Sequence, residues 1–542
     1  MIYQAEQYGI LPGKEVAGEL YALLQTIARQ QGEKTLVFSK GTYYLDAGNA
    51  ASPMLYITNT IGDNEWKTGE EPHRNRVGLY LQGIEHLTIE GNGSEFVMRG
   101  QMTNQALSQC LDIEIRDLAF RAENPDMHEL KVIAKSWNTV DFELDRESTY
   151  TQVGNAYYFT GKDYEVSLLD HRVTAHWIGQ IPADNEDTIR RVHHPMLGAY
   201  RVREIAPHIF RATYLIAPRY RIGDAFYLFD VRRKYQGIFA ERCSDLRLSG
   251  ISQYFNYGLA TVFQDCADVT VSHCNFVPYA GSSKRMASVA DFMQVCMCRG
   301  QVRIEDNTFI GAGDDCLNVH GIHFLVTNVQ GQRVTVRFMH KQSHGFCPFR
   351  AGDTVRYIDV NTLQEQATNV VEHAKLIAED TIELVLRDRV DAALKGIAIE
   401  NASACPNVTF CRNTMKRIIT RGILLTTSGK VLVEDNRFEN TLMHSVLIAD
   451  DAKNWYESGM VRDVTIRGNY FGRCEGYTLA VKPENMRSAG YVHRNIRIVQ
   501  NVIDSNGQGG YYLKDADQVQ IADNTVRGKI RRTVCKNSNI VK

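Results

Sequence analysis

Seven short segments of this chain repeat one pattern, and this repeat constrains the fold more than any other feature of the sequence. In each segment an alternating apolar stretch runs into two polar residues and an Asn, and another apolar residue comes two positions later. The segments are ADVTVSHCNFV (267–277), GQVRIEDNTFI (300–310), PNVTFCRNTMK (406–416), GKVLVEDNRFE (429–439), RDVTIRGNYFG (462–472), RNIRIVQNVID (494–504) and DQVQIADNTVR (517–527). Each is typical of a short strand, a turn at the Asn and the start of another strand.

The distance between equivalent Asn residues gives the size of the repeat. Asn413 to Asn436 and Asn501 to Asn524 are both 23 residues apart. The longer steps are Asn275 to Asn307 (32 residues), Asn436 to Asn469 (33) and Asn469 to Asn501 (32). These longer steps indicate the same coil with about ten extra loop residues.

Three short strands in such a coil are what a right-handed parallel β-helix needs. Successive coils pair their strands about 4.8 Å apart and stack equivalent Asn side chains into a ladder. A β-propeller blade would need four strands in about 40 residues. The sequence therefore predicts an all-β protein, a right-handed parallel β-helix or solenoid.

Two long gaps interrupt the repeat. The step from Asn307 to Asn413 is 106 residues, and roughly 110 surplus residues separate the related segments LDIEIRDLAF (111–120) and DLRLSGISQYF (245–255). Both gaps are rich in alternating segments such as RVTVRF (333–338), which predict two inserted small β-barrel domains. Helical periodicity over Glu15 to Gln31 predicts an N-terminal capping helix over the open end of the first coil. The predicted units are 1–124 (cap and first coils), 125–235 (first insert), 236–321 (central coils), 322–404 (second insert) and 405–542 (last coils).

Composition excludes several classes of protein. Lys and Arg number 61 against 63 Asp and Glu, a formal charge of −2 with no concentration of one sign, so neither nucleic acid nor an anionic membrane is an expected partner. The start MIYQAEQYGILPGKEV lacks the features of a signal peptide, so the chain as written is expected in the cytoplasm, or outside the cell if a leader has been removed. The 12 cysteines are scattered and are expected to be reduced, mostly buried thiols.

Stacked coils place equivalent residues in rows, so a functional site can be sought by register. Eight residues beyond Asn307, Asn413, Asn436 and Asn469 stand Asp315, Arg421, His444 and Tyr477. One coil of 23 residues before Asp314 stands Asp291. We call the resulting line of Asp291, Asp314/Asp315, Arg421, His444 and Tyr477 the site row, with about 5 Å between coils.

Carboxylates stacked at this spacing repel one another, so one of them should hold a proton near neutral pH. A protonated carboxyl beside an ionised one is the equipment of glycosidic-bond hydrolysis. The alternative is that Asp291 and Asp314 are solvated turn residues, since Gly311 and Gly313 give the segment a turn-like composition. Asp314 and Asp315 can both face the row only if Asp314 still belongs to the turn.

Further candidates for substrate binding lie near the site row. Asn318 and His320 share a segment with the aspartates, but strand alternation points His320 away from Asp315 unless the strand ends there, so a structural role for this histidine stays open. The loop ADDAKNWYESG (449–459) offers Trp455 for stacking on a sugar ring and Glu457 for its hydroxyl groups. Burial of Trp455 against the solenoid is the alternative.

The chain resembles glycoside hydrolase family 110, the bacterial exo-acting α-1,3-galactosidases. The segments that carry the resemblance are ADFMQV (290–295), GAGDDCLNVHG (311–321), LLTTSGKVLVEDNRFENTLMHSVLIADDAKNWYESG (424–459) and DVTIRGNYFGRCEGYTLAVKPEN (463–485). The resemblance implies removal of terminal α-1,3-linked galactose, as in the blood-group B determinant, with inversion, no metal and no organic cofactor. It also implies catalytic roles for Asp291, Asp314 and Asp315. A Glu of the second insert is implied as well, but KQSHGFCPFRAGD (341–353) has Cys347 where an acid is expected.

We therefore expect an inverting α-galactosidase that acts on chain ends of an oligosaccharide or glycoconjugate. One Asp of the site row would act as general base and another carboxyl as general acid, while Arg421 and His444 hold galactose hydroxyls. Two alternatives stay open: a polygalacturonase-like hydrolase, which would want a more basic lining than Arg421 and Lys341 supply, and a non-catalytic glycan-binding β-helix. A homodimer is also left open.

Overall fold

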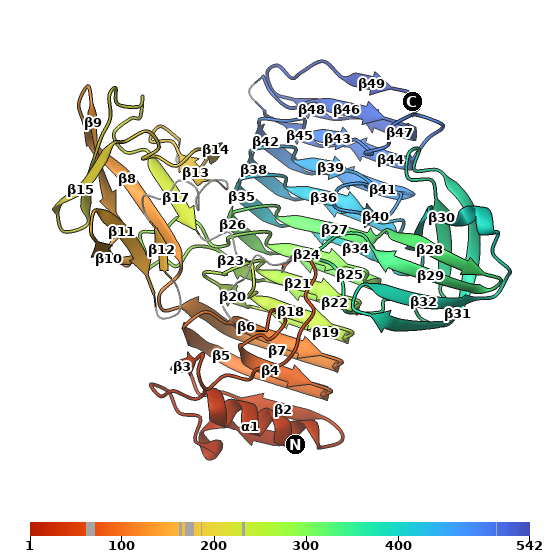
Figure 1. Cartoon of the computed structure of the whole chain (residues 1–542), viewed down its shortest axis with the longest axis horizontal. Helices are drawn as coiled ribbons and strands as arrows, with labels where there is room; N and C mark the ends of the chain where they lie inside the picture. Colours follow the sequence, from red (N-terminus) through yellow and green to blue (C-terminus); the bar gives the residue numbers. More distant parts are fainter. Residues whose placement is uncertain are drawn as a thin grey trace.

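The computed structural model describes residues 1–60, 71–161, 165–167, 178–185, 187–229, 233–505 and 507–541. Parts of the predicted first insert, 125–235, therefore lie outside the described residues. The described chain forms a right-handed parallel β-helix with an antiparallel domain projecting from each side, as Figure 1 shows. The predicted fold class is confirmed.

Three parallel ladders of strands make up the solenoid. Sheet 1 consists of β1 (Ile2–Gln4), β2 (Lys34–Val37), β5 (Glu85–Arg99), β7 (Leu111–Ala122), β19 (Ser244–Ser249), β22 (Ala267–Ser272), β25 (Arg299–Glu305), β34 (Asn407–Cys411), β37 (Lys430–Glu434), β41 (Asp463–Arg467), β44 (His493–Val499), β47 (Ala516–Ala522) and β50 (Ile540–Val541). Sheet 2 consists of β3 (Thr42–Asp46), the later parts of β5 and β7, β20 (Ser252–Gln253), β23 (Asn275–Phe276), β26 (Thr308–Ala312), β35 (Thr414–Ile418), β38 (Arg437–Thr441), β42 (Tyr470–Cys474), β45 (Val502–Ile503) and β48 (Thr525–Val526).

Sheet 3 carries the strands that come directly after the site row. It consists of β4 (Val77–Gln82), β6 (Thr103–Ser108), β18 (Ile238–Glu241), β21 (Thr261–Gln264), β24 (Met293–Cys296), β27 (Leu317–Ile322), β36 (Ile423–Thr426), β39 (Val446–Ile448), β43 (Leu479–Val481), β46 (Tyr511–Lys514) and β49 (Val534–Lys536). A short strand, β40 (Glu457–Ser458), pairs antiparallel with the end of β27. Inward-pointing apolar residues of all three sheets form one continuous core inside the coil.

The turn between sheets 1 and 2 contains the predicted Asn ladder. Asn413 donates its backbone N–H and its side-chain amide to Asn436 Oδ1 (2.9 and 3.1 Å), and the same exchange runs from Asn307 to Asn524. The residue before each ladder Asn has positive φ, for example 60° at Asp306. This left-handed residue turns the chain sharply enough for the Asn to point inward and reach the next coil.

One predicted member of the ladder is wrong. Asn275 pairs with Thr308 and is exposed, while Cys274 pairs in register with Asn307 and donates its backbone N–H to Asn307 Oδ1 at 2.8 Å. The ladder position in that coil is therefore Cys274, one residue earlier. A thiol cannot replace the amide that passes the bonding on, so the Asn ladder begins at Asn307.

The turn between sheets 3 and 1 contains stacked cysteines. Cys110, Cys243 and Cys266 occupy equivalent positions directly before the paired residues of β7, β19 and β22, and Cys298 continues the stack before β25. All 12 cysteines are free, and nine of them are buried. The prediction of reduced, mostly buried thiols agrees with this arrangement.

The first insert emerges between β7 and β18. Its described strands are β8 (Met127–Lys135), β9 (Thr139–Leu144), β10 (Thr149–Val153), β11 (Ala156–Thr160), β12 (Glu165–Ser167), β13 (Ile178–Ile181), β14 (Arg190–Val192), β15 (Arg201–Ala206), β16 (Ile209–Thr213) and β17 (Ala225–Phe229). They form one sheet of seven strands and one of three, all antiparallel. We call this domain insert 1.

The second insert, which we call insert 2, is the predicted barrel. Its strands β28 (Phe324–Gln330), β29 (Arg333–Phe338), β30 (Thr354–Ile358), β31 (Glu365–Ala378), β32 (Thr381–Leu386) and β33 (Ala398–Asn401) close on one another. A short 3-10 helix, η2 (Ala392–Leu394), precedes β33. The barrel has its own apolar core, which is separate from that of the solenoid.

The N-terminal end is capped as predicted. After a 3-10 helix, η1 (Ala5–Tyr8), the helix α1 (Ala17–Ala28) lies at the N-terminal end of the solenoid in Figure 1. Its face of Leu20, Leu23, Leu24 and Ile27 is buried in the solenoid core. Across the described residues, no helix is both long and apolar enough to cross a bilayer.

Candidate active site

The register of sheet 3 aligns five residues of the site row. Met293, Leu317, Ile423, Val446 and Leu479 pair in succession across β24, β27, β36, β39 and β43. The residues two positions before them are Asp291, Asp315, Arg421, His444 and Tyr477. The predicted offset of eight residues from the ladder Asn therefore holds even across insert 2.

The predicted step of 23 residues from Asp291 to Asp314 is wrong by one. Asp291 aligns with Asp315, a step of 24, and Asp315 donates its backbone N–H to Asp291 Oδ1 at 3.3 Å. Asp314 stands one residue earlier, in the turn after β26. A tight turn is needed there, because Gly311 has φ of 83° and a Cβ on Gly313 would lie 2.1 Å from the Val289 carbonyl oxygen.

Asp315 is held by a dense set of donors. Arg421 binds it through Nε (2.8 Å to Oδ1) and a terminal nitrogen (2.7 Å to Oδ2), and the Arg421 backbone N–H adds a third bond at 3.0 Å. The Thr420 hydroxyl donates to the same Oδ1. Burial raises the pKa of Asp315, with Arg421 opposing the shift and Asp314 adding to it. With only 1% of its surface exposed, Asp315 anchors Arg421.

Asp314 is the more exposed carboxyl and is surrounded by arginines. Its Oδ2 accepts a hydrogen bond from Arg233 at 3.0 Å, and 22% of its side chain is exposed. Burial would raise the pKa of Asp314, but the charges of Arg233, Arg421 and Arg191 outweigh it and hold this pKa below its usual value. Asp314 is therefore ionised at neutral pH.

Asp291 has the opposite electrostatic environment. Burial, followed by the charges of Asp314 and Asp315, raises the pKa of Asp291 well above the usual value, and the smaller opposing effects of Arg233 and Arg421 do not compensate. Only 6% of Asp291 is exposed. The row therefore combines a carboxyl that retains its proton with a neighbouring one that has lost it.

The row continues with Arg421 and His444 on the next two coils. His444 Nδ1 accepts a hydrogen bond from the Tyr477 backbone N–H at 2.9 Å, which leaves the proton on Nε2, and its ring stacks on that of Tyr477. Burial and the charges of Lys482 and Arg421 lower the pKa of His444 to about 4. Above that pH the residue offers one neutral N–H donor.

Asn318, His320 and Glu457 form a second cluster on the outer face of sheet 3. Asn318 donates its amide to Glu457 Oε1 at 2.9 Å, and His320 Nε2 lies 3.8 Å from the same oxygen. His320 Nδ1 donates to the Gly321 carbonyl (2.8 Å), so Nε2 is free to accept from Gln294 Nε2 at 3.1 Å. Asn318 and His320 are 4% and 2% exposed, a burial that suits residues which position Glu457.

Trp455 lies at the surface and not in the solenoid core. Its side chain is 47% exposed and stacks on the ring of His340 from insert 2, with centroids 4.7 Å apart. The loop around it is ordered by Asp451, which accepts the backbone N–H groups of Lys453, Asn454 and Trp455. The alternative of a core tryptophan is therefore excluded.

Several residues of the site escape the repeat. Arg191 and Arg233 come from insert 1 and from the chain leaving it, and His340 comes from the loop after β29 of insert 2. None of them has a register in the coil, so the spacing of the sequence carries no signal for them. Thr420 and Gln294 do have a register in the coil, because Thr420 directly precedes Arg421 and Gln294 of β24 follows Asp291. Cys347, which stands where the resemblance implies an acid in insert 2, is half-buried beside Phe349.

The solenoid fold and a turn row that pairs a protonated with an ionised carboxyl define the class: a β-helical glycoside hydrolase. α-1,3-Galactosidase A of Bacteroides thetaiotaomicron is 31% identical to the chain over 520 residues, covering 95% of this chain and 89% of the relative. The chain belongs to the family of this protein, the α-1,3-galactosidases.

Further matches agree with this assignment. α-1,3-Galactosidases A and B of Akkermansia muciniphila are 28% and 26% identical over 502 and 542 residues, covering 92% and 97% of this chain and 81% and 66% of the relatives. A family model described as GLAA-B beta-barrel domain II matches residues 333–396, within insert 2. A model described as right handed beta helix region matches residues 375–530.

Proposed function

We propose that this chain is an exo-acting α-galactosidase that removes terminal α-1,3-linked galactose from oligosaccharides or glycoconjugates, with inversion at the anomeric carbon. The observation that carries the proposal is that two pKa values in the site row are shifted in opposite directions, upward at Asp291 and downward at Asp314. Membership of the α-1,3-galactosidase family supplies the substrate.

In the proposed mechanism Asp291 is the general acid and Asp314 the general base. Asp291 gives its proton to the glycosidic oxygen as the bond to the anomeric carbon breaks, and Asp314 takes a proton from the water that attacks this carbon from the opposite side. The two residues belong to adjacent coils and differ by one position in register, so they lie diagonally across the row. The distance between two carboxyl groups on a diagonal is longer than the strand spacing of about 4.8 Å. It is therefore closer to the roughly 6.5–9.5 Å between carboxyl groups that inversion requires.

Arg421 has a positioning role in this scheme. Its guanidinium group is locked by Asp315 while its charge lowers the pKa of Asp314, which keeps the base ionised. About 25% of the Arg421 side chain is exposed, so the same group can also donate to a galactose hydroxyl. His444 Nε2–H is the next donor along the row.

Coverage of sheet 3 next to the row supports action at chain ends. Loop 449–459 contains β40, which pairs with β27. Thr58, in the segment between β3 and β4, donates its backbone N–H to Gln264 Oε1 at 2.9 Å. His340 reaches Trp455 from insert 2. A polysaccharide running along the solenoid would have to cross these segments, whereas a terminal sugar need not.

The arginines at the row do not favour a uronate substrate. Arg421 is paired with Asp315 and Arg233 with Asp314, so the charges of these two arginines are already neutralised. A galactose residue, which carries no charge, fits this balance better than the galacturonate of a polygalacturonase.

The stereochemistry of the first product tests the proposal. Proton NMR during hydrolysis of an α-1,3-galactosyl disaccharide, with and without a fucosyl branch, should show β-galactose before mutarotation produces the α-anomer. Polygalacturonate serves as the control substrate and should remain intact. Initial release of α-galactose would refute inversion, and release of galacturonate without galactose would refute the substrate.

A further inference from the structure

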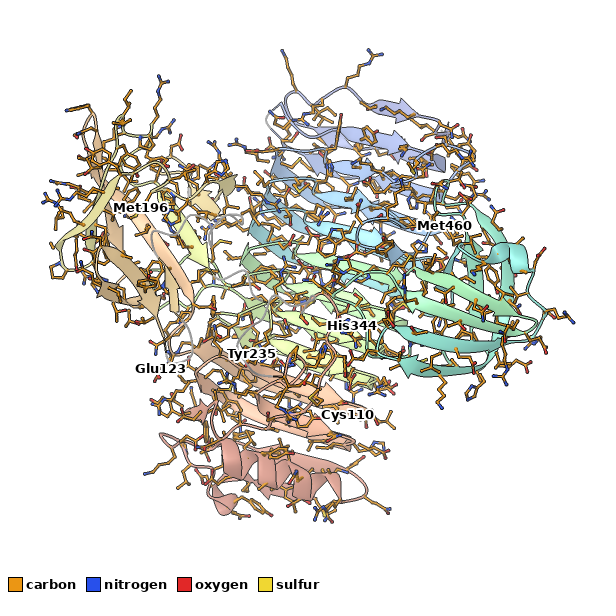
Figure 2. The ribbon with its side chains drawn as sticks, viewed as in Figure 1. Cys110, Glu123, Met196, Tyr235, His344 and Met460 are labelled. Atoms are coloured by element: carbon orange, nitrogen blue, oxygen red, sulfur yellow. The ribbon has the colours of Figure 1, made fainter. Side chains whose placement is uncertain are left out.

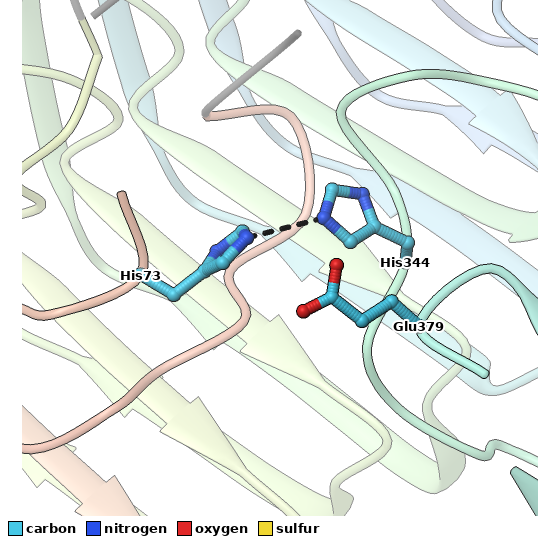
Figure 3. Close-up of side chains that lie close together, drawn as sticks. All are labelled: His73, His344 and Glu379. Atoms are coloured by element: carbon cyan, nitrogen blue, oxygen red, sulfur yellow. Dashed lines mark hydrogen bonds between the residues drawn. The ribbon is translucent and has the colours of Figure 1, made fainter. Parts of the chain in front are cut away.

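A cluster of two histidines and a glutamate lies outside the site row. It joins the end of the segment before β4, which we call the N-terminal segment, to insert 2. His73 belongs to the segment before β4, His344 to the loop between β29 and β30, and Glu379 to the turn between β31 and β32. Figure 2 shows His344 at the junction between the solenoid and insert 2, and Figure 3 shows the three side chains facing one another. Neither the repeat nor the proposed hydrolysis accounts for this cluster.

The three side chains lie close enough together to bind one metal ion. One ligand atom from each of the three residues lies within 4.8 Å of the other two. His73 Nε2 and His344 Nε2 are 3.2 Å apart and share a hydrogen bond, whose proton a metal ion would replace. Tetrahedral Zn²⁺ with nitrogen ligands at about 2.0–2.1 Å separates neighbouring ligand atoms by about 3.3 Å, so the two nitrogens are already spaced for one ion.

Hydrogen bonding prepares His344 as a ligand. Its Nδ1 lies 3.1 Å from the Lys341 carbonyl oxygen, to which it donates, and this leaves the Nε2 lone pair directed at the cluster. Metal-bound histidines usually donate their other ring nitrogen in this way.

Tyr56 holds the other two residues. Its ring stacks on His73 with centroids 4.2 Å apart, and its hydroxyl donates to Glu379 Oε1 at 3.0 Å. A Cβ on Gly345 would lie 2.0 Å from the Tyr56 ring, so the backbone after His344 approaches as closely as a glycine allows. The cluster is therefore packed in place and is not a chance meeting of surface side chains.

We propose that His73, His344 and Glu379 bind one divalent zinc ion, which clips the N-terminal segment to insert 2. Two imidazoles and one carboxylate are a ligand set that Zn²⁺ prefers, and a water would complete the four ligands. A pocket of about 730 Å³, lined in part by His344 and Glu379, gives the ion a path from solvent.

The clip would restrain the loop that reaches the active site. His340, four residues before His344, lines the same pocket and stacks on Trp455. The loop that contains His340 and His344 is also held by a backbone hydrogen bond, in which the Asn59 N–H donates to the Gln342 carbonyl at 2.8 Å. Bound zinc would add its binding free energy to this contact and so stabilise the folded chain.

Calorimetric titration of the chelator-treated full chain with zinc chloride tests the proposal. A Cys535→Ser background removes the exposed thiol as a competing ligand. We expect one Zn²⁺ per chain, a higher melting temperature with zinc, and the absorption of four-coordinate Co²⁺ when cobalt is added instead. His73→Ala and His344→Ala should weaken zinc binding at least about a hundredfold, and Glu379→Gln about tenfold.

Matched controls separate this site from adventitious binding. His86→Ala and Glu372→Gln replace exposed residues of the same types elsewhere and should leave zinc affinity unchanged. If a histidine variant fails to fold, Glu379→Gln, at an exposed position, still decides the question. Equal stoichiometry and affinity in the parent chain and the variants, or no rise in melting temperature with zinc, would overturn the proposal. None of these measurements depends on glycoside hydrolysis.

Discussion

At the scale of single residues, the site row works through differences between three neighbouring carboxyls. Asp291 is buried next to the charges of two other carboxylates, Asp314 is paired with Arg233, and Asp315 is enclosed by Arg421 and Thr420. Identical side chains therefore acquire different protonation states from their surroundings alone. Each of them should be indispensable for a different reason.

Replacing each aspartate by asparagine should abolish most turnover without unfolding the chain. We expect Asp291→Asn, Asp314→Asn and Asp315→Asn each to lower kcat at least about a hundredfold. Asp291 and Asp314 are the positioned acid and base, which contribute that much, and Asp315 holds Arg421 in place beside them. Asp523→Asn, at an exposed turn position of the last coils, is the matched control and should keep full activity. Near-normal turnover in any two of the three site variants would show that the active site lies elsewhere.

Arg421 and His444 should affect different kinetic constants. Arg421→Met removes a charge that lowers the pKa of Asp314, so the base becomes ionised only at higher pH and the acidic limb of the kcat profile moves upward. His444→Ala removes a sugar contact and should mainly raise KM. Arg467→Met, an exposed arginine paired with Glu434, serves as the control. An unchanged pH profile and KM in both variants would remove these side chains from the site.

At the scale of elements, the Asn ladder sets the register on which the site row depends. Each interior Asn is bonded to the coils on both sides of it. Asn436 accepts from the Asn413 backbone and donates to the Phe410 carbonyl of the preceding coil, and it also donates to Asn469 of the next coil. The next strand of sheet 3 begins at a constant number of residues after each ladder Asn. The ladder therefore determines the position of each residue of the site row along the solenoid axis.

Asn436→Ala should destabilise the solenoid more than the same change at the end of the ladder. It leaves buried donors and acceptors on neighbouring coils without partners, at about 1–3 kcal/mol each. Asn524→Ala affects a half-buried Asn near the C-terminal end, where water can replace the lost bonds. Urea unfolding monitored by circular dichroism should therefore give a lower midpoint for Asn436→Ala. Equal midpoints for the two variants would contradict the ladder's role.

At the scale of the whole molecule, the proposed active site is assembled from four parts of the chain. The solenoid supplies the aspartates, insert 1 and its return segment supply Arg191 and Arg233, and insert 2 supplies His340. Inserts on opposite sides of the solenoid, as Figure 1 shows, thus meet the same face. The continuous core also encloses six of the 12 cysteines.

Thiol labelling should report the compactness of the whole chain. Cys535 is exposed and should react with a thiol reagent within the first phase, and the half-buried Cys347 and Cys405, whose pKa values burial raises, should react slowly after it. The nine buried cysteines should react only after unfolding. Cys535→Ser should remove the fast phase. Rapid labelling of the buried thiols in the native chain would contradict this prediction.

The sequence by itself determined the repeat and the rows of residues that the repeat aligns. Strand alternation and the recurring Asn predict the solenoid, and a constant offset places Asp315, Arg421 and His444 in one row because every coil must present the same backbone groups to the next. The two errors, at Asn275 and in the step from Asp291, are single-residue shifts within that repeat. They arise because the coils before Asn307 carry extra loop residues without a ladder Asn to mark the register.

Only the tertiary structure decided how the inserts complete the site. Arg233 reaches Asp314, and His340 reaches Trp455, across contacts between domains that share no repeat and leave no spacing in the sequence. Likewise the burial of Asp291 and the charges facing Asp314, which give these two carboxyls opposite protonation states, depend on neighbours brought together from distant parts of the chain. A periodic sequence specifies local register, whereas burial and charge at one point are sums over everything packed around it.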